Sequence, residues 1–194
     1  IEWVVWDKKL ILVLSWIWKI QSSLWVSFLI ENYAPDRIIN IWVAWNVSDK
    51  EVSVWDVFLP STFYQHDFYV PFAWNHDLYA KDSIEISSIV ENDFLDKIKD
   101  DFSVIGSSVN ITWDQFVDNL GVIEKLKNRF NPDTVEMEAF SVLSVAREYN
   151  LLDRCTIIKA VSDSADEGAS DNIFENMNIA MNNSVRVLDD FIIY

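Results

Sequence analysis

Carboxylates follow two predicted strands in the second half of the chain, and their spacing could serve acid–base chemistry. Glu136 and Glu138 stand two residues apart in the run VEMEAF, at the end of one strand. Ser162, Asp163 and Asp166 follow a second strand in the run VSDSADEGASD. Because ligands bind outside the carboxyl ends of strands in open α/β sheets, we expect the two clusters to converge on one site. An alternative interpretation is that these acids begin helices and are stabilised by the helix dipole.

Histidine and cysteine offer no recognisable metal site. His66 and His76 lack metal-ligand spacing with each other or with Cys155, and phosphate-loop patterns are absent, so we expect no metal and no cofactor. Cys155 is the only cysteine and lies in the apolar run CTIIKAV, which predicts a thiol in the core. A chain without a disulfide framework is typical of a reducing compartment, and we expect a cytoplasmic protein.

The charge and hydropathy of the chain exclude two classes of partner. The formal net charge of -16 would repel a phosphate backbone, so we expect no nucleic acid and instead a small molecule or a protein. The apolar segment from Leu10 to Ile30 has the length of a membrane span. Lys19 at its middle would cost about 2.5–3.5 kcal/mol on insertion, so we expect a buried strand and an amphipathic helix there, and no membrane partner.

Strand-like and helix-like runs alternate along the chain, which indicates an α/β fold. The six predicted strands are residues 10–14, 37–43, 54–64, 102–109, 134–137 and 155–161. The four predicted helices are residues 18–33, 119–130, 138–150 and 171–192. With 51% apolar residues, the length suits one domain over residues 1–194, with three αβα layers around a mixed, mostly parallel sheet.

Several motifs occur together in a family-specific order. They are YQHD within residues 52–70, TWDQFV at 112–117, VEMEA at 135–139 and VSDSAD at 161–166, preceded by residues 15–46. In this order and spacing the chain resembles the methylthioadenosine/S-adenosylhomocysteine nucleosidases of the nucleoside phosphorylase superfamily. The resemblance implies a nucleoside phosphorylase-like fold and an enzyme of methionine salvage and nucleoside catabolism. Its reaction would use water to cleave the N-glycosidic bond of 5′-methylthioadenosine and S-adenosylhomocysteine, releasing adenine and the thioribose.

The resemblance assigns the purine end of the site. Asp163 would protonate adenine N7, with Ser162 orienting it, because the base gains negative charge as the bond breaks. Phe116 would stack on the purine, and the backbone of Val117 would hydrogen-bond to its edge. A plain core role for Phe116 is the alternative.

The resemblance also assigns the sugar end of the site. Glu138 would accept hydrogen bonds from the ribose hydroxyls, Met137 would pack against the sugar, and Glu136 would help to set the water or the ribose loop. Lys159 stands where relatives often have arginine, which keeps the charge and loses the bidentate fork. Met137 has a core role as its alternative.

Tryptophan stands where the resemblance implies glycine. The chain has 10 tryptophans against 3 glycines. Seven replace glycines of the family pattern, namely Trp16, Trp18, Trp25, Trp42, Trp45, Trp55 and Trp113, and the same rule would include Trp3, Trp6 and Trp74. One residue type replacing one other suggests that the gene uses UGA for glycine and has been read with UGA as tryptophan. Trp42 and Trp45 would then be glycines of a loop at the ribose.

Three further expectations follow from the resemblance. The family's first strand, with the glutamate that activates water, would precede Ile1, so this stretch by itself is expected to be inactive or nearly so. The loop after Tyr64 is shorter than in relatives, which leaves the preferred 5′-substituent open. A homodimer is expected, with the apolar run LPSTFYQHDFYVPF as a candidate interface.

Two other functions stay open. A phosphorylase of the same superfamily would need basic residues around phosphate, and the run IWVAWN has only Arg37 nearby, at the wrong end of the strand. A non-catalytic nucleoside-binding relative is favoured if the tryptophans are taken literally.

Overall fold

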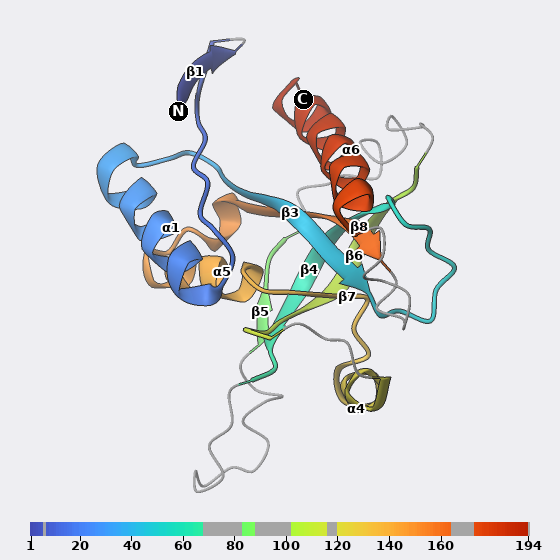
Figure 1. Ribbon diagram of the computed structural model, residues 1–194. Helices are drawn as coiled ribbons and strands as arrows, with labels where there is room; N and C mark the ends of the chain where they lie inside the picture. Colours follow the sequence, from blue (N-terminus) through green and yellow to red (C-terminus); the bar gives the residue numbers. More distant parts are fainter. Residues whose placement is uncertain (6, 68–82, 88–101, 116–119, 164–172, 194) are drawn as a thin grey trace, which may run out of the picture.

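The computed structural model describes residues 1–5, 7–67, 83–87, 102–115, 120–163 and 173–193. Its strands are β1 (Glu2–Val5), β2 (Lys8–Ile11), β3 (Ile38–Asn46), β4 (Val57–Gln65), β5 (Ser83–Glu85), β6 (Val104–Thr112), β7 (Thr134–Glu136) and β8 (Cys155–Asp163). Its helices are α1 (Lys19–Tyr33), α4 (Leu120–Phe130), α5 (Ala139–Glu148) and α6 (Ile173–Ile193), with a 3-10 turn at Leu152–Arg154 (Figure 1).

The main sheet is mixed, and its longest pairings are parallel. Its strand order is β5-β4-β6-β7-β3-β8, with β3 parallel to β8 and β4 parallel to β6. Strand β8 also pairs antiparallel with β4 at Ala160 and Lys159, so the sheet curls until its two sides meet. The predicted mixed, mostly parallel α/β sheet is confirmed, and the closure through β4 and β8 is an addition to the prediction.

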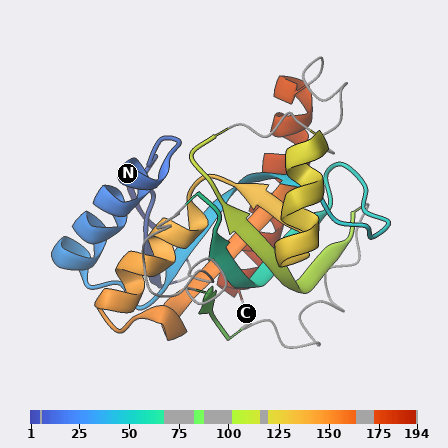
Figure 2. The ribbon, with the colours of Figure 1, turned by 90° about the horizontal axis from the view of Figure 1, so that it is seen from below.

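Helices cover the sheet from both sides. In Figure 1, α1 and α5 lie together on one side, α6 lies on the other, and α4 stands apart from both groups. Figure 2 shows α1 and α5 side by side from below. Val26 of α1 and Leu143 of α5 share a buried cluster with Phe63 of β4. Val187 of α6 packs in a second cluster with Ile158 of β8. The αβα layers of the prediction are therefore present around the sheet.

Strand β8 has the character of a strand covered on both faces. All nine of its residues are buried, which fits the continuous apolar run CTIIKAV. Cys155 is a buried free thiol, as predicted, and burial raises its pKa to about 12. The two polar residues that end this strand, Ser162 and Asp163, are thereby carried into the interior.

The prediction of a buried strand at residues 10–14 is wrong. Strand β2 pairs only with β1, in a two-stranded hairpin that stands apart from the main sheet in Figure 1. Leu12 and Leu14 are exposed because no other part of the described chain packs over this segment. The apolar composition of the run was mistaken for a core position.

The amphipathic pattern expected for the helix at residues 18–33 is also wrong. Ser22, Val26 and Ile30 face the core, but Ile20 and Leu24 are exposed on the other side of α1. The helix therefore carries apolar side chains on both faces, and the outer face is not covered by the described chain. Among the described residues no helix is both long and apolar enough to cross a membrane.

Candidate active site

The two predicted acid clusters come from the ends of β7 and β8, the two strands that flank β3 in the sheet. Glu136 ends β7, and Glu138 stands at the N-cap position of α5 two residues later. Lys159, on β8, reaches across to both of them: its Nζ lies 2.7 Å from Glu136 Oε2 and 3.7 Å from Glu138 Oε2. All three side chains are buried, so the structure places one cation between two carboxylates inside the protein.

The Glu136 carboxylate is fully engaged by protein groups. Its Oε2 accepts from the backbone N–H groups of Glu138 and Ala139, at 2.9 and 2.8 Å. Its Oε1 accepts from Asn110 Nδ2 at 3.0 Å and from the Thr112 hydroxyl. The alternative interpretation as a helix N-terminal acid therefore holds for Glu136, because it satisfies amides at the start of α5.

Glu136 stays ionised in spite of its burial. Burial alone would raise its pKa, but the Lys159 ammonium and the hydrogen bonds from Thr112 and Asn110 outweigh that effect and lower the pKa. A carboxylate with this many donors is held in one orientation. Glu136 therefore acts as a fixed negative charge that organises the residues around it.

Glu138 differs from Glu136 in both partners and protonation. Its Oε1 accepts from the backbone N–H of Trp18 at 3.3 Å, whereas none of the described residues donates a hydrogen bond to its Oε2. The side chain is 4% exposed. Burial and the Glu136 charge raise its pKa, Lys159 lowers it, and the net result is a pKa of about 7. Glu138 is thus a buried carboxylate with one oxygen left for a ligand and a proton that exchanges near neutral pH.

Ser162 and Asp163 lie together at the end of β8. The Ser162 hydroxyl donates to Asp163 Oδ2 at 3.0 Å, and both side chains are buried. The pairing register of β8 with β3 skips Ser162, since Val161 pairs with Ala44 and Asp163 pairs with Trp45. A bulge of this kind re-aims a side chain and is frequent beside active sites. The predicted pair is therefore formed, at the carboxyl end of its strand.

Of the other predicted substrate-binding residues, the structure describes one and leaves two undescribed. Met137 is half-buried between Glu136 and Glu138. Phe116 and Val117, predicted to bind the purine, lie outside the described residues. Within the described parts of the chain, no group of His, Cys, Asp and Glu side chains could hold a metal ion.

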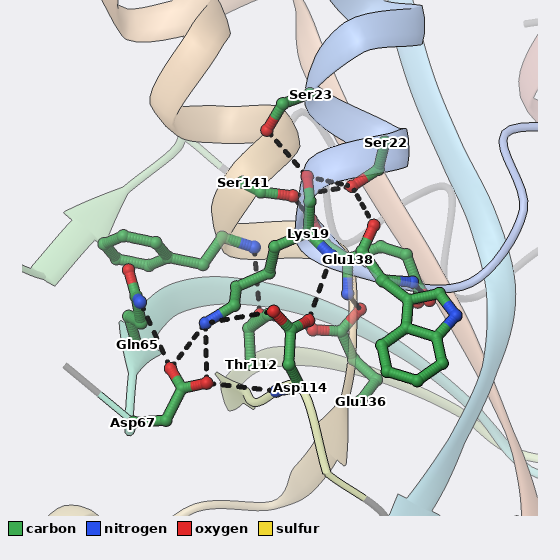
Figure 3. Close-up of polar contacts among 12 residues, drawn as sticks. Lys19, Ser22, Ser23, Gln65, Asp67, Thr112, Asp114, Glu136, Glu138 and Ser141 are labelled. Carbon is green, nitrogen blue, oxygen red and sulfur yellow. Dashed lines mark hydrogen bonds and ion pairs between the residues drawn. The ribbon is translucent and has the colours of Figure 1, made fainter.

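Sequence reasoning missed a second polar cluster beside the first. Lys19 Nζ donates to both oxygens of Asp67, at 2.6 Å each, and lies 3.6 Å from Asp114 Oδ2 (Figure 3). Gln65 Nε2 also donates to Asp67, at 3.1 Å. Lys19 had drawn attention only as a charge inside an apolar segment. Asp67 lies in the motif YQHD and Asp114 lies in the motif TWDQFV. The presence of each residue in a family motif was the signal that could have pointed to this cluster.

Three tryptophans adopt backbone angles that favour glycine. Trp16, Trp18 and Trp55 have φ values of 59°, 98° and 87°. With ψ at 149°, Trp18 lies close to a region that is essentially restricted to glycine. The geometry at these three positions is the one that the resemblance implies, and it supports the hypothesis that glycine belongs there.

Trp42 and Trp45 behave differently from the prediction. Both lie inside β3 rather than in a loop after it, and neither has positive φ. Trp42 packs in the cluster under α6, and Trp45 packs in the cluster under α4. The prediction that Trp42 and Trp45 lie in a loop is therefore wrong, because the strand extends to Asn46.

Comparison with known proteins gives a consistent result. A family model described as the Phosphorylase superfamily matches residues 6–193. An aminodeoxyfutalosine nucleosidase from Helicobacter pylori is 26% identical over 191 residues, covering 96% of this chain and 81% of its own length. A 5′-methylthioadenosine/S-adenosylhomocysteine nucleosidase from Buchnera aphidicola is 26% identical over 184 residues, covering 90% of this chain and 69% of its own.

A solved structure shows the same fold. The crystal structure of a mutant Helicobacter pylori nucleosidase with 5′-methylthioadenosine in its active site superposes with a TM-score of 0.86 at 25% identity. The match covers 98% of this chain and 83% of that one. The predicted nucleoside phosphorylase-like architecture is confirmed.

Proposed function

The chain belongs to the Phosphorylase superfamily, and from this premise we propose that it hydrolyses the N-glycosidic bond of adenine nucleosides with a 5′-thio substituent. The predicted enzyme class, a nucleosidase, is confirmed by the relatives that match most of the chain. The observation that carries the proposal is Glu138, whose buried Oε2 receives no hydrogen bond from the described residues. A ribose hydroxyl would satisfy that oxygen, because a buried acceptor without a donor is costly.

The proposed reaction exchanges one bond to the ribose for another. The bond from C1′ to N9 of adenine breaks and its electron pair leaves with the base, while the oxygen of water bonds to C1′. Asp163 would protonate adenine N7, with Ser162 holding it through their 3.0 Å hydrogen bond. The water loses one proton to the solvent, and Asp163 regains one from the solvent, so that the net change is the addition of one water across the C1′–N9 bond. Phe116 and Val117 remain the proposed contacts to the purine.

Glu138 and Glu136 would have different roles at the sugar: Glu138 would bind it, and Glu136 would orient the groups around it. The ionised form of Glu138 would accept from ribose hydroxyls through Oε2, with Met137 beside the sugar. Glu136 has both oxygens occupied by protein donors, so we propose that it orients Glu138 and Lys159 without touching substrate. The positive charge of Lys159 is then placed where it lowers the cost of ionising Glu138.

The candidate substrates differ in the group at the 5′ position of the nucleoside. We propose 5′-methylthioadenosine and S-adenosylhomocysteine, with a role in methionine salvage in the cytoplasm as a homodimer. The relative from Helicobacter pylori is named for aminodeoxyfutalosine, which makes that nucleoside the second candidate. All three would place a ribose on Glu138, so they would differ at the 5′ end of the site.

A phosphorylase reaction is the alternative within the superfamily. It would need a cation free to bind phosphate beside the ribose. Lys159 and Lys19, two cations that the described structure places at the site, are each within 2.7 Å of a carboxylate oxygen. This pairing favours water over phosphate as the second reactant.

The experiment is a product assay with protein isolated from cells that express it naturally. Each candidate nucleoside is incubated with and without inorganic phosphate, and adenine, free sugar and sugar phosphate are separated by chromatography. We expect adenine and free sugar in equal amounts at a rate that phosphate leaves unchanged. If sugar phosphate were the product, the reaction would be phosphorolysis and the proposed hydrolysis would be wrong. Tight binding of an adenosine analogue without base release would instead identify a non-catalytic relative.

A further inference from the structure

The first turn of α1 is tied to the candidate site by two successive backbone amides. The N–H of Trp18 points at Glu138 Oε1, at 3.3 Å, and the N–H of Lys19 points at Asp114 Oδ1, at 3.0 Å. These amides have no partner inside the helix, since the first turn of any α-helix leaves its N–H groups unpaired. Carboxylates from two other elements therefore take the place of a capping residue.

The side chain of Lys19 fastens the same turn to the ends of β4 and β6. Its Nζ bonds both oxygens of Asp67 and lies near Asp114, as Figure 3 shows. Asp67 in turn accepts from the Asp114 backbone N–H at 3.2 Å. The pair is mostly screened from water, with side-chain exposures of 16% for Lys19 and 22% for Asp67. A partly buried, doubly bonded pair holds its geometry better than an exposed one.

A second tie joins α1 to the backbone of Glu138. The hydroxyls of Ser22 and Ser141 are hydrogen-bonded at 2.7 Å, and Ser141 Oγ donates to the Glu138 carbonyl at 2.6 Å. The main chain of Glu138 is thus fixed through α5, while its carboxylate depends on the amide of Trp18. A shift of the first turn of α1 would move that amide and leave the main chain of Glu138 in place.

We propose that Lys19 is a positioning residue, whose bonds to Asp67 hold the first turn of α1 so that the Trp18 amide orients the Glu138 carboxylate toward the ribose. This inference rests on the proposed function for the identity of the ligand, but the orientation of Glu138 can be measured without any substrate. Lys19 does not touch the reacting atoms in this account. Its effect passes through one backbone hydrogen bond.

Several charged groups surround Glu138 and must be counted in any titration. Lys159 faces it from β8 and Glu136 from β7, while Lys19, Asp67 and Asp114 form the cluster at the start of α1. The hydrogen bond from the Trp18 amide lowers the pKa of Glu138. Losing that bond would therefore raise the midpoint at which Glu138 titrates.

The test is carbon-13 NMR of side-chain carboxyls in protein labelled at glutamate, with the Glu138 signal identified by its loss in Glu138→Gln. Lys19→Met should move the Glu138 midpoint to higher pH, and Lys19→Arg should return it. Lys19→Met could raise the midpoint through loss of its charge or through loss of positioning, and Asp67→Asn separates these two explanations by the sign of its shift. Direct charge effects predict a lower midpoint when the negative Asp67 is removed, whereas loss of positioning predicts a higher one. Lys127→Met is the matched control, because it breaks a 2.6 Å ion pair with Asp49 in a different cluster.

A second measurement, the affinity for a substrate analogue, tests the functional consequence independently of the titration. In Lys19→Met we expect Kd for a non-hydrolysable 5′-methylthioadenosine analogue to rise about tenfold, since small misplacements of a binding group cost one to two orders of magnitude. Lys19→Arg should bind as the parent protein does. An unchanged Glu138 midpoint in Lys19→Met, or a lower one in Asp67→Asn, would overturn the inference. A shifted midpoint with no analogue binding by the parent protein would instead reject the proposed function and leave the positioning role standing.

Discussion

The carboxylate cluster and the turns at Trp16, Trp18 and Trp55 differ in how well residue type agrees with geometry. In the cluster, Glu136 meets donors on every side and its charge is balanced by Lys159. In the turns, a bulky residue takes positive φ, a conformation that is normal for glycine and costly for other residues. Agreement across levels is expected where the recorded residue is the right one. In the cluster, residue type and geometry therefore agree, whereas in the three turns they do not.

The largest effect is expected inside the cluster, from Lys159→Met. The substitution leaves Glu136 and Glu138 as buried carboxylates without their cation, and breaking a buried pair on one side costs about 3–5 kcal/mol. Urea denaturation should show this loss in the free energy of unfolding. Lys50→Met breaks a 2.6 Å pair in which the lysine is exposed, and it should cost clearly less. Equal losses in the two variants would mean that the cluster is not a special feature of the core.

The next effect has the opposite sign and belongs to the turns. Trp18→Gly should stabilise the protein by roughly 1–3 kcal/mol, because that is the cost of a residue held in a sparsely populated backbone region. Trp25→Gly is the matched control, since Trp25 lies inside α1 and packs edge-on against Phe28. Glycine inside a helix is unfavourable by about 1 kcal/mol, so the control should destabilise. Thermal denaturation of both variants measures the difference.

Mass spectrometry of the natural protein can decide the same question without a variant. The tryptic peptide from Leu10 to Lys19 contains Trp16 and Trp18, both of which have positive φ. Under the hypothesis that UGA encodes glycine, its mass will correspond to glycine at both positions. A peptide with two tryptophans would reject the hypothesis. It would also mean that the natural protein has strained backbone at these two tryptophans.

The last effect is a pH dependence of stability, and it belongs to the cluster again. The folded pKa of Glu138 is raised to about 7, above its value in the unfolded chain, so the folded state binds its proton more tightly. The stability from this group is fully present below pH 4.5, the usual value, and is lost as the pH rises to about 7, by roughly 3 kcal/mol in all. Glu138→Gln should remove this slope. Glu136, whose pKa is lowered, contributes the reverse slope in the acid range.

Urea titrations of both proteins between pH 5 and pH 8 measure that slope. The difference in unfolding free energy between the parent protein and Glu138→Gln should change between pH 5 and pH 7 and level off toward pH 8. A constant difference would mean that Glu138 does not titrate there.

Much of the sheet could be predicted because burial on both faces leaves a plain signal. The apolar run from Cys155 to Val161 is a strand for that reason, and the acids at its end follow from the position of ligand sites in α/β folds. The hairpin of β1 and β2 could not be placed, since its apolar residues resemble core residues but have no cover. The partners of Lys19 could not be predicted either, because Asp67 and Asp114 are 48 and 95 residues away in sequence.

The most direct test of the proposed nucleosidase is the rate of adenine release from 5′-methylthioadenosine by the full-length protein and by its Asp163→Asn variant. Asparagine preserves the size of the side chain and removes the acidic proton. General acid catalysis contributes about 10²–10⁴-fold, so the variant should lose that factor while it still binds a non-hydrolysable analogue. Release of adenine at the same rate by both proteins would contradict the assignment of Asp163, and no release by either would contradict the proposed function.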